Sequence, residues 1–234
     1  MKKAKRTARL FPVAFFFQTV YNHKKARCVI LEYTEEKIYK AETETDSDII
    51  YLLGDSSCMG YREHVKKLLP DYNVVYPEEN ARCSQYMLMM LRGWGGLVKS
   101  EKVKLVQFNT GHWDIAHWND EEISLNSIET YTDNMLRIAK TLKRLYPNAK
   151  IVYATTMPMN PNGENSINFR YTSEIKEYNK AAVNALERED VIINDLFSFA
   201  ESFAPSDYAD YCHLTDEANA RVAKHIAEFF SNIL

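Results

Sequence analysis

The chain has 234 residues, 46% of them hydrophobic and 26% charged, with a formal net charge of -3 at pH 7. This composition is typical of globular proteins, and the length is sufficient for one domain with a sizeable core. The 29 basic residues are scattered along the chain, which argues against nucleic acid as a partner. No stretch reaches the ~20 consecutive apolar residues that a membrane-spanning helix requires.

The N-terminal part of the chain differs from the rest. Residues 1–9 carry five basic side chains and no acid, and residues 10–17 are apolar. This pattern resembles the start of a signal peptide, but the apolar run is short, contains a proline and lacks a small-residue cleavage site, so we expect a cytoplasmic protein. Residues 27–41 are rich in Val, Ile and Tyr and predict a short β-hairpin. We therefore divide the chain into an N-terminal appendage, residues 1–47, and a main domain, residues 48–234.

The cysteines show no spacing that is typical of a metal site. The four are Cys28, Cys58, Cys83 and Cys212. A chain of this length does not depend on disulfides for its core, so we interpret them as packed free thiols in a reducing compartment. We expect no bound metal or other cofactor.

The main domain alternates between strand and helix patterns. Short apolar runs without polar alternation predict strands that are buried on both faces, at residues 49–53, 72–76, 103–108, 151–154 and 191–194. Segments with helical spacing lie between them. Asn126 with Glu129 is a candidate capping pair for one helix, and Thr215 is a candidate cap for the last. This alternation predicts a three-layer α/β/α sandwich around a five-stranded parallel sheet.

Ligands of such open sheets bind at the carboxyl ends of the strands, where the strand-to-helix loops meet. Most polar residues that are capable of catalysis lie in these loops. The loops comprise residues 54–60, 77–82, 109–127, 155–171 and 195–213. We therefore place the candidate site at this edge of the sheet.

The first of these loops contains several candidate nucleophiles. Residues 54–58 read Gly-Asp-Ser-Ser-Cys, directly after the first predicted strand and at the start of a helix. A serine there has its backbone N–H and the helix dipole directed at a negative charge forming beside it, as in attack on an ester carbonyl. Asp55 or Ser56 could instead be an ordinary helix cap. Ser57 and Cys58 are competing nucleophiles, which we rank below Ser56 on side-chain direction.

The last loop contains an acid and a histidine at a useful spacing. Asp210 and His213 are three residues apart and immediately precede the candidate cap Thr215. At that spacing a carboxylate can bind one imidazole nitrogen while the other faces a nucleophile, which is the arrangement that acyl transfer requires.

With these two motifs the sequence resembles the SGNH/GDSL hydrolases, over residues 48–234. Gly54-Asp55-Ser56 matches the first block of that family, and Asp210-x-x-His213 matches its last block. The resemblance implies a flavodoxin-like SGNH fold. It also implies a catalytic triad in which Ser56 is the nucleophile, His213 the base and Asp210 the orienting acid. The backbone N–H of Ser56 would be one donor of the oxyanion hole.

The two middle blocks depart from the family pattern. Ala81 stands where the family usually has an oxyanion-hole glycine, and we expect its N–H to serve, provided that the position does not demand a positive φ. Trp113 stands where the family has its oxyanion asparagine. We therefore expect the Asn109 amide to take that role and Trp113 to be a wall for the substrate. His112 and Arg82 are further candidate substrate contacts.

The resemblance would also bring three thiols near the same pocket. A zinc site formed by Cys58, Cys83 and Cys212 is conceivable, but the cysteines are not paired in sequence, and we favour packed thiols.

Three functions are compared on these residues. We expect a serine esterase that removes small acyl groups, acetyl above all, from a small molecule or a carbohydrate. The alternative is an SGNH-like carbohydrate-binding protein that is catalytically weakened by its altered third block. A flavodoxin-like nucleotide binder is disfavoured, because the first loop lacks a glycine-rich phosphate cradle and carries Asp55. The sequence does not indicate an oligomeric state.

Overall fold

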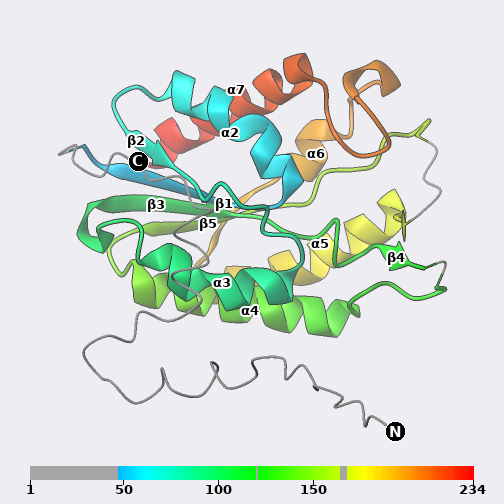
Figure 1. The fold of residues 1–234 in the computed structure, drawn as a ribbon, viewed down its shortest axis with the longest axis horizontal. Helices are drawn as coiled ribbons and strands as arrows, with labels where there is room; N and C mark the ends of the chain where they lie inside the picture. The colour runs from blue at the N-terminus through cyan, green and yellow to red at the C-terminus, as the bar shows by residue number, and fades with distance from the viewer. Residues whose placement is uncertain (1–46, 120, 164–167) are drawn as a thin grey trace, which may run out of the picture.

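The computed structural model describes residues 47–119, 121–163 and 168–234. In these ranges the chain forms three layers, with a sheet between two layers of helices (Figure 1). The predicted α/β/α architecture is confirmed. The hairpin predicted at residues 27–41, and nearly all of the N-terminal appendage, lie outside the described residues.

The central sheet has five strands in the order β2-β1-β3-β5-β7, and neighbouring strands are parallel. The strands are β1 (Ile49–Leu53), β2 (Asn73–Val75), β3 (Val103–Phe108), β5 (Lys150–Ala154) and β7 (Ile192–Asn194). Side chains of β1 alternate between two apolar cores, with Tyr51 and Leu53 in one and Ile50 and Leu52 in the other. Because both faces are covered, the strand carries no polar alternation, which is the pattern seen in the sequence.

The helices divide between the two faces of the sheet. They are α2 (Ser56–Leu68), α3 (Ser84–Gly95), α4 (Ile128–Leu145), α5 (Thr172–Leu186), α6 (Leu196–Ala200) and α7 (Asp216–Ile233), with 3-10 turns at Ser100–Lys102, Glu187–Glu189 and Pro205–Asp207. Helices α3, α4 and α5 cover one face, and α2, α6 and α7 cover the other (Figure 1). Among the described residues, no helix is both long enough and apolar enough to cross a membrane.

A second, two-stranded sheet joins two of the long loops. Strand β4 (His117–Trp118) pairs antiparallel with β6 (Asn168–Phe169). Sequence patterns did not predict it, because a strand of two residues is too short to show any periodicity. The pairing ties the loop after β3 to the loop after β5, both on the carboxyl edge of the sheet.

Helix caps agree with the sequence at one end of the domain and differ at another. Thr215 caps α7, since its side chain accepts a hydrogen bond from the N–H of Ala218, as predicted. The cap of α4 is Ser127, which accepts from the N–H of Thr130. The capping role predicted for Asn126 is therefore wrong. Its side chain bonds to Asp114 instead.

Helices α2 and α7 pack so closely at Gly60 that no larger residue fits. A Cβ atom added there would lie 2.6 Å from Oδ1 of Asn219, whose Nδ2 donates to the Leu214 carbonyl at 3.1 Å. At Gly95, by contrast, the nearest atom would be the Cδ1 of Leu145, at 3.1 Å and at the end of a flexible side chain.

Gly60→Ala is expected to lower the free energy of unfolding by about 1 kcal/mol, and by no more than about 2 kcal/mol. Overpacking costs roughly 1–3 kcal/mol and the helical preference of alanine returns only about 1 kcal/mol. Gly95→Ala is the matched control and should be neutral or slightly stabilising. Urea unfolding of both variants measures this, and a Gly60→Ala protein as stable as the control would contradict the close packing of α2 on α7.

Candidate active site

The corner between β1 and α2 is fixed by a buried carboxylate. Asp55 caps α2, because its Oδ1 accepts the N–H of Ser57 at 3.0 Å, and Ser56 is the first residue of the helix. Asp55 is fully buried. A Cβ atom at Gly54 would lie 2.1 Å from Oδ1 of Asn109, so the glycine is required by close approach of the neighbouring loop. The hydroxyl of Ser56 is therefore held at the helix start on a rigid turn.

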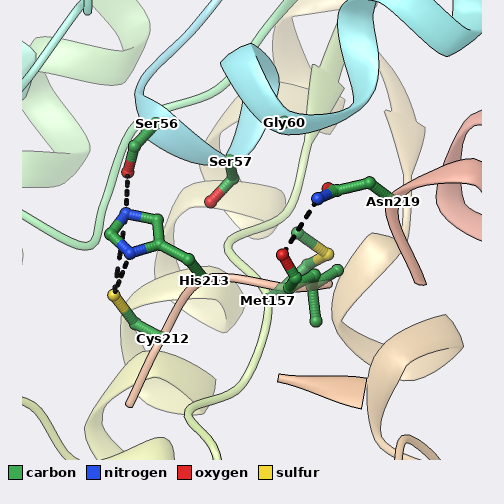
Figure 2. Close-up of a pocket in the computed structure, with 8 residues that line it drawn as sticks. Ser56, Ser57, Gly60, Met157, Cys212, His213 and Asn219 are labelled. Carbon is green, nitrogen blue, oxygen red and sulfur yellow. Dashed lines mark hydrogen bonds between the residues drawn. The ribbon is translucent and has the colours of Figure 1, made fainter. Parts of the chain in front are cut away.

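Ser56, His213 and Asp210 form a continuous chain of hydrogen bonds. His213 Nε2 lies 3.0 Å from the Ser56 Oγ, and His213 Nδ1 lies 2.7 Å from Asp210 Oδ2. Figure 2 shows the imidazole directed at the serine hydroxyl. With a proton on Nδ1 donated to the carboxylate, Nε2 is free to accept the hydroxyl proton.

The carboxylate of Asp210 is itself held by backbone donors. Its Oδ1 accepts the N–H of Cys212 at 2.8 Å and the N–H of His213 at 2.7 Å. Burial acts to raise the pKa of Asp210, but these two N–H donors and the His213 imidazole outweigh it and lower the pKa below its usual value. Asp210 is therefore ionised at neutral pH and can orient the imidazole.

The loop that carries His213 is braced at its base. The Ala209 N–H donates to the His213 carbonyl at 2.8 Å, and the Thr215 N–H donates to the Asp207 carbonyl at 2.8 Å. Tyr208 and Leu214 also pair as an isolated antiparallel bridge. The imidazole is thus presented by a short hairpin-like turn just before α7.

Two of the three expected oxyanion donors already make a hydrogen bond within the protein, so their role at an oxyanion stays a prediction. The Ala81 N–H donates to the Gly54 carbonyl at 2.9 Å. The Asn109 amide donates to Asp55 Oδ1 at 2.9 Å, and its oxygen accepts from the Tyr61 hydroxyl at 3.2 Å. The Ser56 N–H, by contrast, has no acceptor among the described residues. Asn109 braces the nucleophile corner with one amide N–H, and its second N–H has no acceptor among the described residues.

Ala81 meets the condition set for it in the sequence analysis, because the positive φ of this loop belongs to the next residue. Arg82, not Ala81, has φ of 53°. The Arg82 N–H donates to Asn80 Oδ1 at 2.7 Å, and its guanidinium lies over the Tyr86 ring, 4.6 Å from the centroid. Arg82 is exposed, with its charge available to solvent.

His112 and Trp113 do not line the space beside the nucleophile. His112 is only 2% exposed, and its Nε2 donates to the Met157 carbonyl at 2.8 Å. Burial lowers the pKa of His112, so the ring is neutral at pH 7. Trp113 packs against Trp118 with ring centroids 5.3 Å apart. Both residues support the loop after β3, and a contact with substrate stays a prediction.

The rival nucleophiles are poorly equipped. Burial raises the pKa of Cys58 to about 12, so its thiol is not ionised at neutral pH. Ser57 has no imidazole partner in the described part of the chain. Cys212 Sγ lies 3.6 Å from His213 Nδ1, but burial raises its pKa to about 12 as well. Ser56 alone combines helix-start placement with a hydrogen-bonded base.

The three-thiol zinc site weighed from the sequence finds no counterpart in the described residues. The metal-capable group found there contains a single cysteine, and comprises Asp210, Cys212 and His213, whose ligand atoms lie within 4.8 Å of one another. Asp210 and His213 are already bonded to each other, in the series of hydrogen bonds that ends at Ser56.

A small cavity of about 110 Å³ opens beside the serine. Its walls come from α2, the loop after β5, the last loop and α7 (Figure 2). The lining residues are Ser56, Ser57, Gly60, Met157, Cys212, His213, Leu214 and Asn219.

Comparison with known proteins agrees with this geometry. The model of the GDSL-like lipase/acylhydrolase family matches residues 52–221. The chain belongs to this family. No curated protein sequence matches the chain.

Solved structures share the fold at low identity. A GDSL-like lipase from Bacteroides thetaiotaomicron has a TM-score of 0.64 and 14% identity, covering 88% of this chain and 98% of its own. Est24, a carbohydrate acetylesterase from Sinorhizobium meliloti, has a TM-score of 0.63 and 14% identity, covering 80% and 100%. A carbohydrate esterase of family 3 from Talaromyces cellulolyticus has a TM-score of 0.59 and 15% identity, covering 80% and 97%.

In this member of the GDSL-like family a second buried carboxylate ties the middle loops together. Asp114 accepts hydrogen bonds from the Ser84 N–H and hydroxyl, the Thr110 hydroxyl and the Asn126 amide. Burial raises the pKa of Asp114 to about 6, and these donors act in the opposite direction. Sequence reasoning missed Ser84 and Asn126, because nothing in their local pattern distinguishes them from helix-start residues.

Stability is expected to depend on pH through Asp114. Its pKa is about 6 in the folded protein against an ordinary value of 3.8, so the folded state binds this proton more tightly. The contribution of this bound proton to the free energy of unfolding is fully present below about pH 4 and is lost as pH rises through 6. It amounts to at most about 3 kcal/mol.

Urea unfolding between pH 4 and 8 tests this against Asp114→Asn, which cannot titrate. The stability of the unsubstituted protein relative to the variant should fall across the window. A difference that stays flat, or one that grows with pH, would show that the donors keep Asp114 ionised throughout.

Proposed function

We propose that the protein is a serine esterase that hydrolyses esters of short acyl groups through Ser56, His213 and Asp210. The observation that carries the proposal is the pair of hydrogen bonds made by the imidazole of His213. Its Nε2 lies 3.0 Å from the Ser56 hydroxyl, and its Nδ1 lies 2.7 Å from the ionised carboxylate of Asp210. Membership in a family of lipases and acylhydrolases makes ester hydrolysis the reaction class to which this arrangement belongs.

The proposed reaction has two halves. Ser56 Oγ attacks the ester carbonyl while His213 Nε2 takes its proton, and the same nitrogen returns that proton to the departing alcohol. Water then attacks the acyl-serine while His213 Nε2 accepts its proton, and the carboxylic acid leaves as that proton returns to Ser56 Oγ. Asp210 holds the imidazole with its Nδ1–H toward the carboxylate and stabilises the imidazolium that forms in each half.

The negative charge on the tetrahedral intermediate falls beside the start of α2. The Ser56 N–H has no acceptor in the described chain and lies at the positive end of a helix of 13 residues. It is the donor that we assign to the oxyanion. The Ala81 N–H would first have to leave the Gly54 carbonyl in order to join it, whereas the Asn109 amide keeps a second N–H beside its bond to Asp55.

A second candidate follows from that last observation. If Ala81 keeps its hydrogen bond to the Gly54 carbonyl, the intermediate has fewer donors, and loss of one such donor typically costs about 10²-fold or more in rate. The protein would then be a catalytically weakened carbohydrate-binding member of the family. A fluorophosphonate probe separates the two, because it labels Ser56 only if the hydroxyl is activated.

We propose short acyl groups because of the cavity beside the nucleophile. Its volume of about 110 Å³ suits an acetyl group better than a fatty acyl chain. The carbohydrate esterases among the structures with this fold make a sugar a reasonable alcohol for the ester. The buried free thiols Cys58 and Cys212 suit a cytoplasmic location, which we keep as part of the proposal.

Ser56→Ala is expected to reduce the hydrolysis of p-nitrophenyl acetate by at least about 10³-fold, because the nucleophile is lost. The melting temperature should change little, since the hydroxyl is at the protein surface. Ser57→Ala is the matched control one residue away, and it should keep more than about a tenth of the activity. If Ser56→Ala retains full turnover, the triad proposal fails.

The cavity predicts a dependence on acyl length. The kcat/KM for p-nitrophenyl esters should be greatest for acetate, fall by butyrate and be lowest for octanoate. Met157→Ala removes side-chain atoms from the cavity wall. It should raise the activity on the butyrate and octanoate esters relative to the activity on the acetate ester. Met89→Ala, at an exposed position on α3, is the control and should leave that ratio unchanged. Equal activity on all lengths would show that the acyl group binds elsewhere.

A further inference from the structure

Arg170 is a buried cation close to the candidate active site. It follows β6, is 7% exposed, and donates through Nε to the His112 carbonyl. Its Nη1 donates to the Tyr211 hydroxyl at 3.1 Å and, more weakly, to the Asn168 carbonyl at 3.4 Å. All three acceptors are neutral, so these contacts position the guanidinium without balancing its charge.

The charge of Arg170 has no partner in the described chain. No carboxylate of the described residues forms an ion pair with it, and the two fully buried carboxylates of this region accept hydrogen bonds from other groups. Asp55 accepts hydrogen bonds from Ser57 and Asn109. Asp114 accepts hydrogen bonds from the N–H and the hydroxyl of Ser84. Buried arginines are normally paired, because removing a charge from water is costly.

One nitrogen of the guanidinium remains available. Nη2 has no acceptor among the described residues, and it is not one of the buried, unpartnered polar atoms, which include Asp55 Oδ2 and Trp94 Nε1. The side chain as a whole is 7% exposed, so Nη2 is a donor without an acceptor on a largely covered guanidinium.

Arg170 lies at the same edge of the sheet as the triad. It bonds to Tyr211, which stands two residues before His213. Burial is the largest influence on the pKa of Cys212, and the positive charge of Arg170 is the next, acting to lower it. The charge of Arg170 therefore acts on Cys212, the residue next to His213.

We propose that Arg170 forms an anion subsite that binds a carboxylate on the substrate. This proposal rests on the proposed esterase function. A cation positioned by neutral acceptors, with the two N–H groups of Nη2 unbonded, matches an acidic substrate such as an acetylated uronic acid. Guanidinium binds carboxylates through directional, charge-assisted hydrogen bonds. The bonds from Arg170 to Tyr211 and His112 would keep that subsite in register with Ser56.

The test compares two substrates that differ in one group. Acetylated methyl glucopyranosiduronate carries a carboxylate where acetylated methyl glucopyranoside carries a hydroxymethyl group, and the acetyl ester and the ring are the same. The unsubstituted protein should have a KM at least about tenfold lower for the uronate. Raising the salt concentration should shrink this difference, because dissolved ions screen the attraction between the substrate carboxylate and the guanidinium. Equal KM values for the two esters would overturn the proposal.

Variants separate charge recognition from a merely structural clamp. In Arg170→Gln the ratio of the two KM values should fall to about one, whereas Arg170→Lys should keep part of it. Tyr211→Phe removes a bond that holds the guanidinium but leaves the charge, and should preserve the ratio even if overall activity falls. Loss of the ratio in Tyr211→Phe together with its retention in Arg170→Gln would overturn the proposal. If Arg170→Gln does not fold, Arg170→Lys and the unsubstituted protein decide.

A binding measurement keeps this inference distinct from the proposed catalysis. In the Ser56→Ala protein, methyl glucuronate should raise the melting temperature more than methyl glucoside at equal concentration, and introducing Arg170→Lys should reduce the difference. Selective binding without ester hydrolysis would remove the esterase proposal and leave the anion subsite. Hydrolysis of neutral acetyl esters without any preference for the uronate, in rate or in binding, would do the reverse.

Discussion

The site depends on the packing of α2 along α7. These helices follow strands in different parts of the sheet, β1 near one edge and β7 at the other, yet they lie side by side on the same face (Figure 1). Their N-terminal ends consequently meet at the carboxyl edge of the sheet. Ser56 opens the first helix and His213 stands just before the second, so the packing that buries apolar side chains also brings the hydroxyl within 3.0 Å of the imidazole. The closeness of Gly60 to Asn219 is the tightest point of that contact.

Sequence reasoning reached the fold and the two ends of the site because both depend on local patterns. Unbroken apolar runs give buried strands, helical spacing gives the covering helices, and parallel connection places the loops at one edge. Asp210 and His213 were found because their partnership is local, three residues apart. Ser56 was found because a serine at a strand-to-helix corner has a distinctive environment. In each case the chemistry could be inferred within a single turn of chain.

The middle of the site could not be inferred in this way. Whether the Ala81 N–H faces an oxyanion depends on which acceptor lies nearer, and its acceptor, the Gly54 carbonyl, belongs to another loop, as does Asp55, which accepts one N–H of Asn109. The resemblance supplied a role for each position but not the competing internal partner. Asn126 illustrates the same limit. A local capping role was reasonable, but the long-range bond to Asp114 prevails, because a buried carboxylate must gather donors from wherever the fold brings them.

The two outermost strands of the sheet are short. β2 and β7 each have three residues, whereas β3, in the centre, has six. An outer strand exposes a row of backbone donors and acceptors to which a strand of another chain can add, and shortness limits the length of such a row. The sheet therefore offers little template for fibril-like stacking.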